Sequence, residues 1–151
     1  MENAGQFLQQ IVHNQLDLPQ IEDIVRTKRA AKEAVPGFGH PDFRPIDPRA
    51  QRLLDMATTQ GLAGEHVAAL KQLSQAVDAV VGKPVTINVT GAIGAILADM
   101  GLPPRIMRGI SLIARTPGLV GQLKEEMDNP IADHFQGIAR RDVTYAPSNN
   151  R

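Results

Sequence analysis

The sequence predicts an all-α fold. Apolar residues recur at the three- and four-residue spacing of amphipathic helices through nearly the whole chain. Glycine and proline stand between the periodic segments, where they end one helix and allow the next to begin. Only the short window over residues 83–89 has the pattern of a strand. We therefore expect about seven or eight helices, with no internal repeat.

Two amphipathic helices precede the first long loop. The apolar face of the first is made by Phe7, Leu8, Ile11, Val12 and Leu16. The second follows Pro19, and its apolar face is made by Ile21, Ile24, Val25 and Ala31. Because both faces recur at helical spacing, each helix is expected to bury one side in the core.

Residues 35–50 form the most distinctive segment, a loop rich in glycine, proline and arginine. Its glycines let a ligand approach the backbone closely, and its arginines offer forked donors for carboxylate or phosphate. His40 adds a side chain whose charge responds near neutral pH. Asp47 and Pro48 predict the N-cap and the first residue of a helix, whose N-terminus favours negative charge. The segment therefore indicates an anion-binding loop.

The middle of the chain predicts two more helices and the strand-like window. The first helix covers residues 48–61, and the second covers residues 64–81, with Gly82 as its C-cap. Residues 83–89 then lead directly into the next helix. These elements place the strand-like window between two helices.

The last third of the chain predicts three helices and a tail. Small residues dominate the helix at 91–101, which would allow close approach of a neighbouring helix. The next helix covers residues 103–115, and the Thr-Pro-Gly sequence at 116–118 is expected to interrupt it. A further helix ends at the Asn-Pro pair of residues 129–130. The chain after Gly137 is polar and is expected to fray.

Composition bounds the class of protein. The 151 residues include 16 basic and 16 acidic side chains, and the net charge is zero. This balance disfavours a nucleic-acid-binding arm or a polybasic membrane patch. The sequence has no cysteine, no apolar run long enough to span a membrane and no signal-peptide pattern at its start. We therefore expect a cytoplasmic protein that contacts neither nucleic acid nor membrane.

Three segments resemble the citrate synthase and citryl-CoA lyase family. Residues 36–49, with Pro36-Gly37-Phe38-Gly39-His40, Arg44 and Asp47-Pro48-Arg49, resemble the loop that carries the second catalytic histidine. Residues 87–94 resemble the Asn-Val-Asp-Gly segment of citryl-CoA lyases and of the C-terminal module of ATP-citrate lyase. Residues 113–121 resemble the segment with a citrate-binding arginine.

The resemblance implies a domain organisation. It corresponds to the C-terminal part of the family fold, with a helical domain over residues 1–137 and a polar tail over residues 138–151. The first catalytic histidine of the family lies upstream of the matching region and is absent from these residues. The expectation is an incomplete or split family member that a complementing subunit completes.

The resemblance also implies residue roles toward a citrate- or oxaloacetate-like acid. His40 would contact the carbonyl oxygen of the acid and stabilise charge there. Arg49 and Arg115 would bind its carboxylates. Without the resemblance, His40 could equally satisfy backbone groups in a turn, and both arginines could extend into solvent. Arg49 sits in the first turn of a helix, where the dipole disfavours a cation, and an anionic ligand would explain its position.

Coenzyme A, carried as an acyl thioester substrate, is the second implied ligand. Arg44 would meet its phosphates, and Lys83 would do the same, although exposed lysines are usually just solvated. The backbone of Pro36, Gly37, Phe38 and Gly39 would hold its adenine. His13, His66 and His134 match no family position and are expected on the surface or at helix ends, without metal-ligand spacing. No metal site is predicted.

One substitution limits the predicted activity. Thr90 stands where the family has the aspartate that removes a proton from the acyl methyl group. A threonine hydroxyl is not basic near neutral pH, so the isolated chain is predicted to be inactive. Asn129 also stands near an arginine position of some relatives. The alternatives are a non-catalytic, regulatory binder of CoA and a tricarboxylate, or a helical domain that binds neither. A homodimer or higher oligomer is expected in each case.

Overall fold

The computed structural model describes residues 1–143, and in this part every regular element is a helix, as predicted. The chain divides into two compact units, one over Met1–Ile110 and one that begins at Ser111. The helices are α1 (Glu2–His13), α2 (Leu18–Ala30), α3 (Pro48–Thr59), α4 (Glu65–Val81), α5 (Val89–Asp99), α6 (Pro104–Asp128) and α7 (Ala132–Asp142). Within the described residues no helix is long and apolar enough to cross a bilayer.

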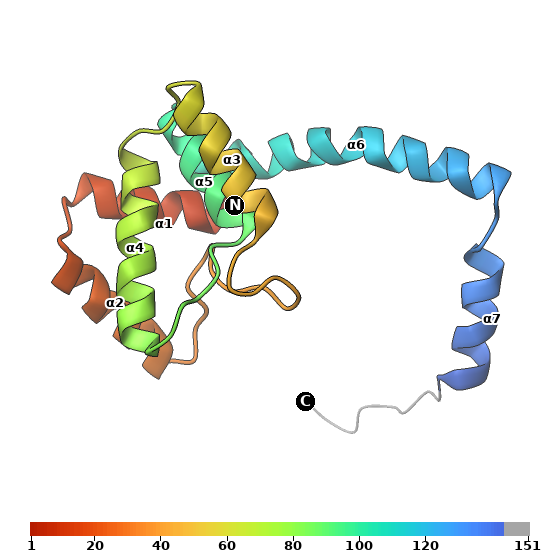
Figure 1. Ribbon diagram of the computed structural model, residues 1–151, viewed down its shortest axis with the longest axis horizontal. Helices are drawn as coiled ribbons and strands as arrows, with labels where there is room; N and C mark the ends of the chain where they lie inside the picture. The colour runs from red at the N-terminus through yellow and green to blue at the C-terminus, as the bar shows by residue number, and fades with distance from the viewer. Residues whose placement is uncertain (144–151) are drawn as a thin grey trace. The chain divides into compact units, whose positions relative to one another are not determined.

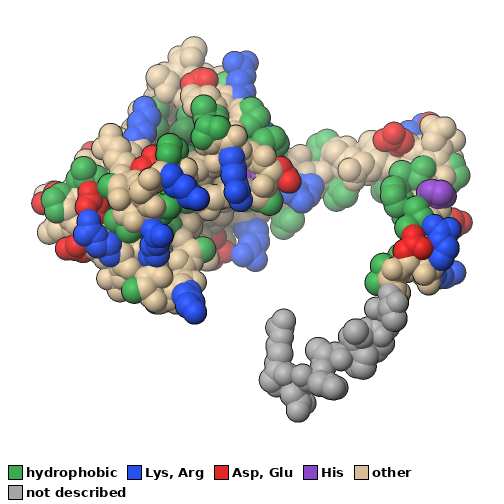
Figure 2. Space-filling model, turned by 60° about the horizontal axis from the view of Figure 1, so that its bottom comes forward, with side chains coloured by type: hydrophobic (Ala, Val, Ile, Leu, Met, Phe, Trp, Pro, Cys, Tyr) green, Lys and Arg blue, Asp and Glu red, His purple; other side chains and the backbone are tan. Residues whose placement is uncertain are grey.

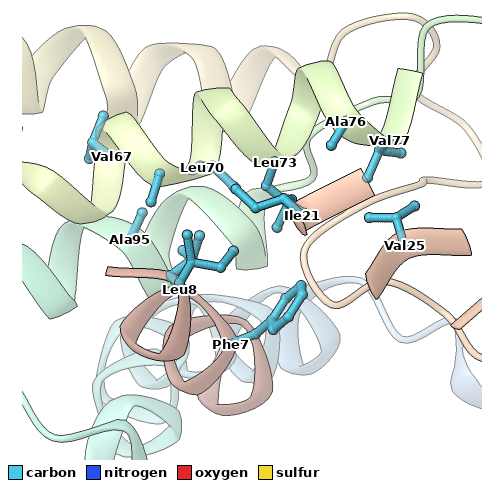
Figure 3. Close-up of a cluster of buried hydrophobic side chains, with 12 residues drawn as sticks. Phe7, Leu8, Ile21, Val25, Val67, Leu70, Leu73, Ala76, Val77 and Ala95 are labelled. Carbon is cyan, nitrogen blue, oxygen red and sulfur yellow. The ribbon is translucent and has the colours of Figure 1, made fainter. Parts of the chain in front are cut away.

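The core of the first unit lies between α1, α2, α4 and α5. In Figure 1, α4 lies beside α1 and α2, and α3 lies beside α5. Leu8, Ile21 and Leu73 meet at the centre of the buried cluster drawn in Figure 3. Ala95 extends this cluster onto α5, whose small residues let it pack closely against its neighbours. The predicted faces are therefore confirmed at Phe7, Leu8 and Ile11 of α1 and at Ile21 and Val25 of α2. Ala31 was wrongly assigned to the second face, because it follows the end of α2 and is exposed.

The helix boundaries follow the predicted signals at several positions. Asp47 is the N-cap of α3, with Pro48 at its first position, and its side chain accepts a hydrogen bond from the backbone N–H of Arg49. Gly82 ends α4 in the left-handed conformation, at φ 78°. Glycine takes this conformation without the steric cost that a Cβ atom adds.

The predicted strand at residues 83–89 is wrong. One isolated antiparallel bridge, between Phe38 and Ile87, forms there instead. Two backbone bonds flank it, from the N–H of Gly39 to Thr86 at 2.8 Å and from the N–H of Asn88 to Gly37 at 3.0 Å. The pairing stops because Asn88 is already the N-cap of α5. The alternating pattern at residues 83–89 thus corresponds to a short extended segment that pairs with the loop of residues 35–47.

The predicted interruption at residues 116–118 is also wrong, because α6 continues through Pro117 to Asp128. A proline within a helix removes one backbone bond, here to the carbonyl of Ile113. Ile113 is 69% exposed, so water can satisfy the carbonyl that loses its partner. At the other predicted boundary, α7 runs across Gly137 to Asp142. The rest of the predicted polar tail, residues 144–151, lies outside the described residues.

The second unit exposes much of its apolar surface. Figure 2 shows hydrophobic side chains on the surface of this part of the chain. The exposed members are Leu112, Ile113, Leu119, Val120, Leu123, Met127, Ile131, Phe135 and Val143. Exposed apolar surface of this extent is typical of an interaction face.

Candidate functional site

The loop of residues 35–47 rests on the start of α5 through two glycines. Gly37 has φ 92°, a conformation that glycine adopts without strain. A Cβ atom on Gly91 would lie 2.6 Å from the carbonyl oxygen of Gly37, and one on Gly37 would lie 2.8 Å from the Cα of Gly91. The atoms in close contact belong to the backbone, so they cannot move aside as the end of a flexible side chain can. The site is therefore built on a contact that only glycine permits on both sides.

Asn88 joins the loop to α5 by hydrogen bonds in two directions. Its Nδ2 donates to the carbonyl oxygen of Gly39 at 3.0 Å. Its Oδ1 accepts the backbone N–H groups of Thr90 and Gly91, at 3.0 and 3.2 Å, as the helix N-cap. Asn88 thereby fixes the position of the glycine-rich loop relative to Thr90.

Asp47 is the buried anion of the site. Its side chain is 0% exposed, and its two carboxylate oxygens accept from the Nε and one terminal nitrogen of Arg49, at 3.0 and 2.9 Å. The backbone N–H of Val89 donates to the same carboxylate at 3.0 Å. The hydrogen bonds from Arg49 outweigh the effect of burial and lower the pKa of Asp47 to about 2. Asp47 is thus ionised at neutral pH and links α3 to α5.

This ion pair accounts for the position of Arg49. The sequence predicted an anionic ligand beside this cation in the first turn of α3, whereas the anion that the structure places there is the protein's own Asp47. Arg49 remains 50% exposed, and its second terminal nitrogen makes no bond to Asp47. Its guanidinium carbon lies 4.8 Å from the centre of the Phe43 ring. Arg49 is held on one edge and offers the other edge to a ligand.

Both ring nitrogens of His40 face donor groups. The backbone N–H groups of Asp42 and Phe43 lie 3.1 Å from Nδ1. Nε2 lies 2.9 Å from a terminal nitrogen of Arg49, the same nitrogen that donates to Asp47. A neutral imidazole accepts at only one of its nitrogens, so the two contacts require different tautomers. The contact places the imidazole of His40 directly beside the guanidinium of Arg49.

Thr90 lies in the first turn of α5, half-buried. Its hydroxyl donates to Oδ1 of Asn88 at 2.6 Å. The hydroxyl of Thr90 is therefore neutral, and its hydrogen is already donated to Asn88. It cannot act as a general base near neutral pH.

Two hollows lie beside this loop. One, of about 400 Å³, is lined by Gly39, His40, Arg44 and Lys83, so that predicted phosphate-binding residues distant in sequence share one cavity. The other, of about 240 Å³, is lined by Pro36, Gly37 and Thr90, together with Arg108. The structure thus gathers the predicted positions around a common loop. The side chain of Phe38 is an exception, because it packs against the core and leaves only its backbone for a ligand.

Arg115 belongs to the second unit. It lies on the part of α6 that follows Ile110, and its side chain is exposed. Its predicted role toward a carboxylate stays a prediction. Among the described residues, no group of three or more His, Asp or Glu side chains is placed to hold a metal ion.

Sequence reasoning missed several contacts. Asp47 was assigned only as a helix cap, and Asn88 was not singled out, although Asn-x-Thr at a helix start is a capping signal. His66, expected at the surface or a helix end, lies in the first turn of α4 with its Nδ1 2.8 Å from Asp99 and its side chain only 18% exposed. Asp99 also accepts the backbone N–H groups of Gly64, His66 and Val67. No local pattern reveals this pair, because the two residues lie 33 positions apart.

The fold and the loop together define an all-helical domain in which glycines and basic side chains line one loop. Residues 1–140 match the family described as "Citrate synthase, C-terminal domain". The chain belongs to the citrate synthase and citryl-CoA lyase family. It is also similar to the solved citryl-CoA lyase from Hydrogenobacter thermophilus, with 34% sequence identity and a TM-score of 0.83. That match covers 99% of this chain and 57% of the lyase chain, so the chain spans little more than half of its length.

Proposed function

We propose that this chain supplies part of a site that binds a CoA thioester and a citrate-like acid for Claisen-type formation or cleavage of a carbon–carbon bond. The contact between His40 and Arg49, with 2.9 Å between Nε2 and a terminal nitrogen, is the observation that carries the proposal. An imidazole beside a guanidinium suits the carbonyl oxygen and carboxylate of a 2-oxo acid or citrate. Asp47 holds Arg49 in place, so the two side chains are already adjacent before a ligand arrives.

The CoA part of the proposal rests on the hollow beside His40. Arg44 and Lys83 bring two positive charges to its lining, and the exposed residue Gly39 of the loop lines it as well. Cationic side chains next to open backbone suit the phosphates of a nucleotide. In this arrangement the thioester and the acid meet across the loop of residues 36–40.

Catalysis requires groups that these residues do not supply. Thr90 provides no base, and the first catalytic histidine of the family would have to come from outside the 151 residues, in the same polypeptide or in a partner. The test is to assay citrate synthesis from acetyl-CoA and oxaloacetate, and cleavage of citryl-CoA. We expect no turnover by the chain alone, and turnover when a family N-terminal half and Thr90→Asp are combined. Turnover by the unmodified chain would show that the base is assigned wrongly.

A second candidate is a regulatory binder without catalysis. The hydrogen bond from Thr90 to Asn88 favours it, because this position is adapted to hold a helix cap rather than to move a proton. The binder would retain Arg44 and Arg49 for its ligands. It predicts that CoA and citrate bind, while a complementing half and Thr90→Asp produce no turnover.

We also propose that the chain assembles with a second copy or with a complementing subunit, in the cytoplasm. The exposed apolar residues of the second unit support an assembly, because isolated domains rarely leave so many large apolar side chains in water. Light scattering tests it, and a monomer at micromolar concentration in the presence of the complementing half would contradict it.

A further inference from the structure

The hollow beside Thr90 contains a cation that no family role explains. Arg108, on the first turns of α6, lines it together with Thr90 and the backbone of Gly37. All three lie in the first unit. Among residues 1–143, Arg108 makes no ion pair and no hydrogen bond from its side chain. It therefore remains available to an anion.

Thr90, in the lining of the same hollow, is neutral. Where the family has an aspartate, Thr90 directs its hydroxyl hydrogen to Asn88 and carries no charge. An aspartate there would repel a ligand carboxylate or pair with Arg108 itself. Glu2 is the acidic side chain in the lining, and it forms no ion pair with Arg108 within the described residues. The exchange to threonine thus leaves the positive charge of Arg108 without a fixed counter-charge.

We propose that this hollow binds a carboxylate at the end of the acyl chain of the CoA thioester, with Arg108 as its partner. The inference rests on the proposed function, in which the position of Thr90 faces the acyl group. A volume of about 240 Å³ exceeds the roughly 30 Å³ of one water several times over, so a short chain with a carboxyl group fits where a methyl group would leave empty space. The substrate class is therefore a dicarboxylic acyl thioester rather than a simple acetyl thioester.

Competition between two thioesters tests the inference. Succinyl-CoA and acetyl-CoA are titrated into the full chain, and the ratio of their dissociation constants is the readout. We expect succinyl-CoA to bind about tenfold more tightly, as a charge-assisted hydrogen bond provides. Arg108→Gln removes this preference while acetyl-CoA binds as before. Glu2→Gln increases it, because a repulsive charge leaves the hollow.

Arg105→Gln is the matched control. Arg105 is exposed on the same first turns of α6 but does not line the hollow, so the preference should remain. Thr90→Asp should abolish the preference by restoring the negative charge. Equal affinities in the unmodified chain, or a preference that survives Arg108→Gln, would overturn this inference and leave the proposed function intact. If neither succinyl-CoA nor acetyl-CoA binds, both this inference and the proposed function are overturned.

Discussion

The Nε2 atom of His40 lies 2.9 Å from a terminal nitrogen of Arg49. The backbone N–H groups of Asp42 and Phe43 point at Nδ1, so both ring nitrogens of His40 face donors. The nitrogen of Arg49 in this contact also donates to the buried carboxylate of Asp47. Asp47 therefore compensates the charge of Arg49 and holds it beside His40.

Asp47→Asn should lower stability. The variant removes the negative charge that holds Arg49. It also replaces one carboxylate oxygen, which accepts from Arg49 and from the backbone N–H of Val89, by an amide group. We expect the free energy of unfolding to fall by about 2 to 4 kcal/mol, within the range for breaking a buried charged contact. Urea unfolding followed by circular dichroism measures it. A loss below about 0.5 kcal/mol, the usual effect of a surface substitution, would show that Asp47 holds nothing in place.

Acid should destabilise the protein in a defined range. The folded state lowers the pKa of Asp47 from 3.8 to about 2. A carboxylate with a lowered pKa contributes stability above its unfolded pKa, and this contribution is lost as the pH falls through the folded pKa. We therefore expect a loss of about 2 kcal/mol that begins near pH 4 and continues through pH 2. Urea midpoints at several pH values test it, and Asp47→Asn should flatten the curve.

Asp99 should matter as the cap of a helix other than its own. Burial raises the pKa of Asp99. Hydrogen bonds from the backbone of His66, Gly64 and Val67 and from the His66 side chain lower it by more, so the pKa is lowered overall. Asp99→Ala leaves the N-terminus of α4 without this acceptor. We expect a loss of about 2 to 4 kcal/mol. Asp23→Ala, at an exposed position of α2, is the control and should change stability by less than about 0.5 kcal/mol.

Glycine at position 91 should be required for the site. In Gly91→Ala the new methyl group meets the carbonyl oxygen of Gly37 at 2.6 Å, so the loop must move away from α5. We expect a destabilisation of about 2 to 4 kcal/mol and weaker ligand binding. Gly109→Ala is the matched control, since nothing lies within 4 Å of its Cβ position, and it should stabilise α6 by up to about 1 kcal/mol. Similar stability in the two variants would contradict the close contact of the loop with α5.

The sequence predicted most of the fold because local signals agree with the packing. Apolar spacing located the helices of the core, and Asp47-Pro48 and Gly82 located two of their ends. The prediction of a strand at residues 83–89 was wrong because this segment pairs with the loop at one bridge only, between Ile87 and Phe38. The break at Pro117 failed because an exposed helix can lose one hydrogen bond to water.

The site was less predictable than the fold. A resemblance could name His40, Arg49 and Thr90, but not the contacts that set their states. The orientation of the His40 ring depends on backbone groups of its own turn, and the position of Arg49 depends on its ion pair with the buried Asp47. Arg108 joins Thr90 only through tertiary structure. Such contacts between distant segments leave no local pattern in the sequence.

Binding of citrate to the full chain tests the central claim most directly. Isothermal calorimetry at neutral pH should detect citrate binding to the unmodified protein. His40→Asn keeps an acceptor near the backbone N–H groups of Asp42 and Phe43 but lacks the ring nitrogen beside Arg49, and it should weaken citrate binding about tenfold. Absence of heat at millimolar citrate, or equal affinity in the unmodified protein and His40→Asn, would contradict the assignment of His40 and Arg49 as the binding residues for the acid.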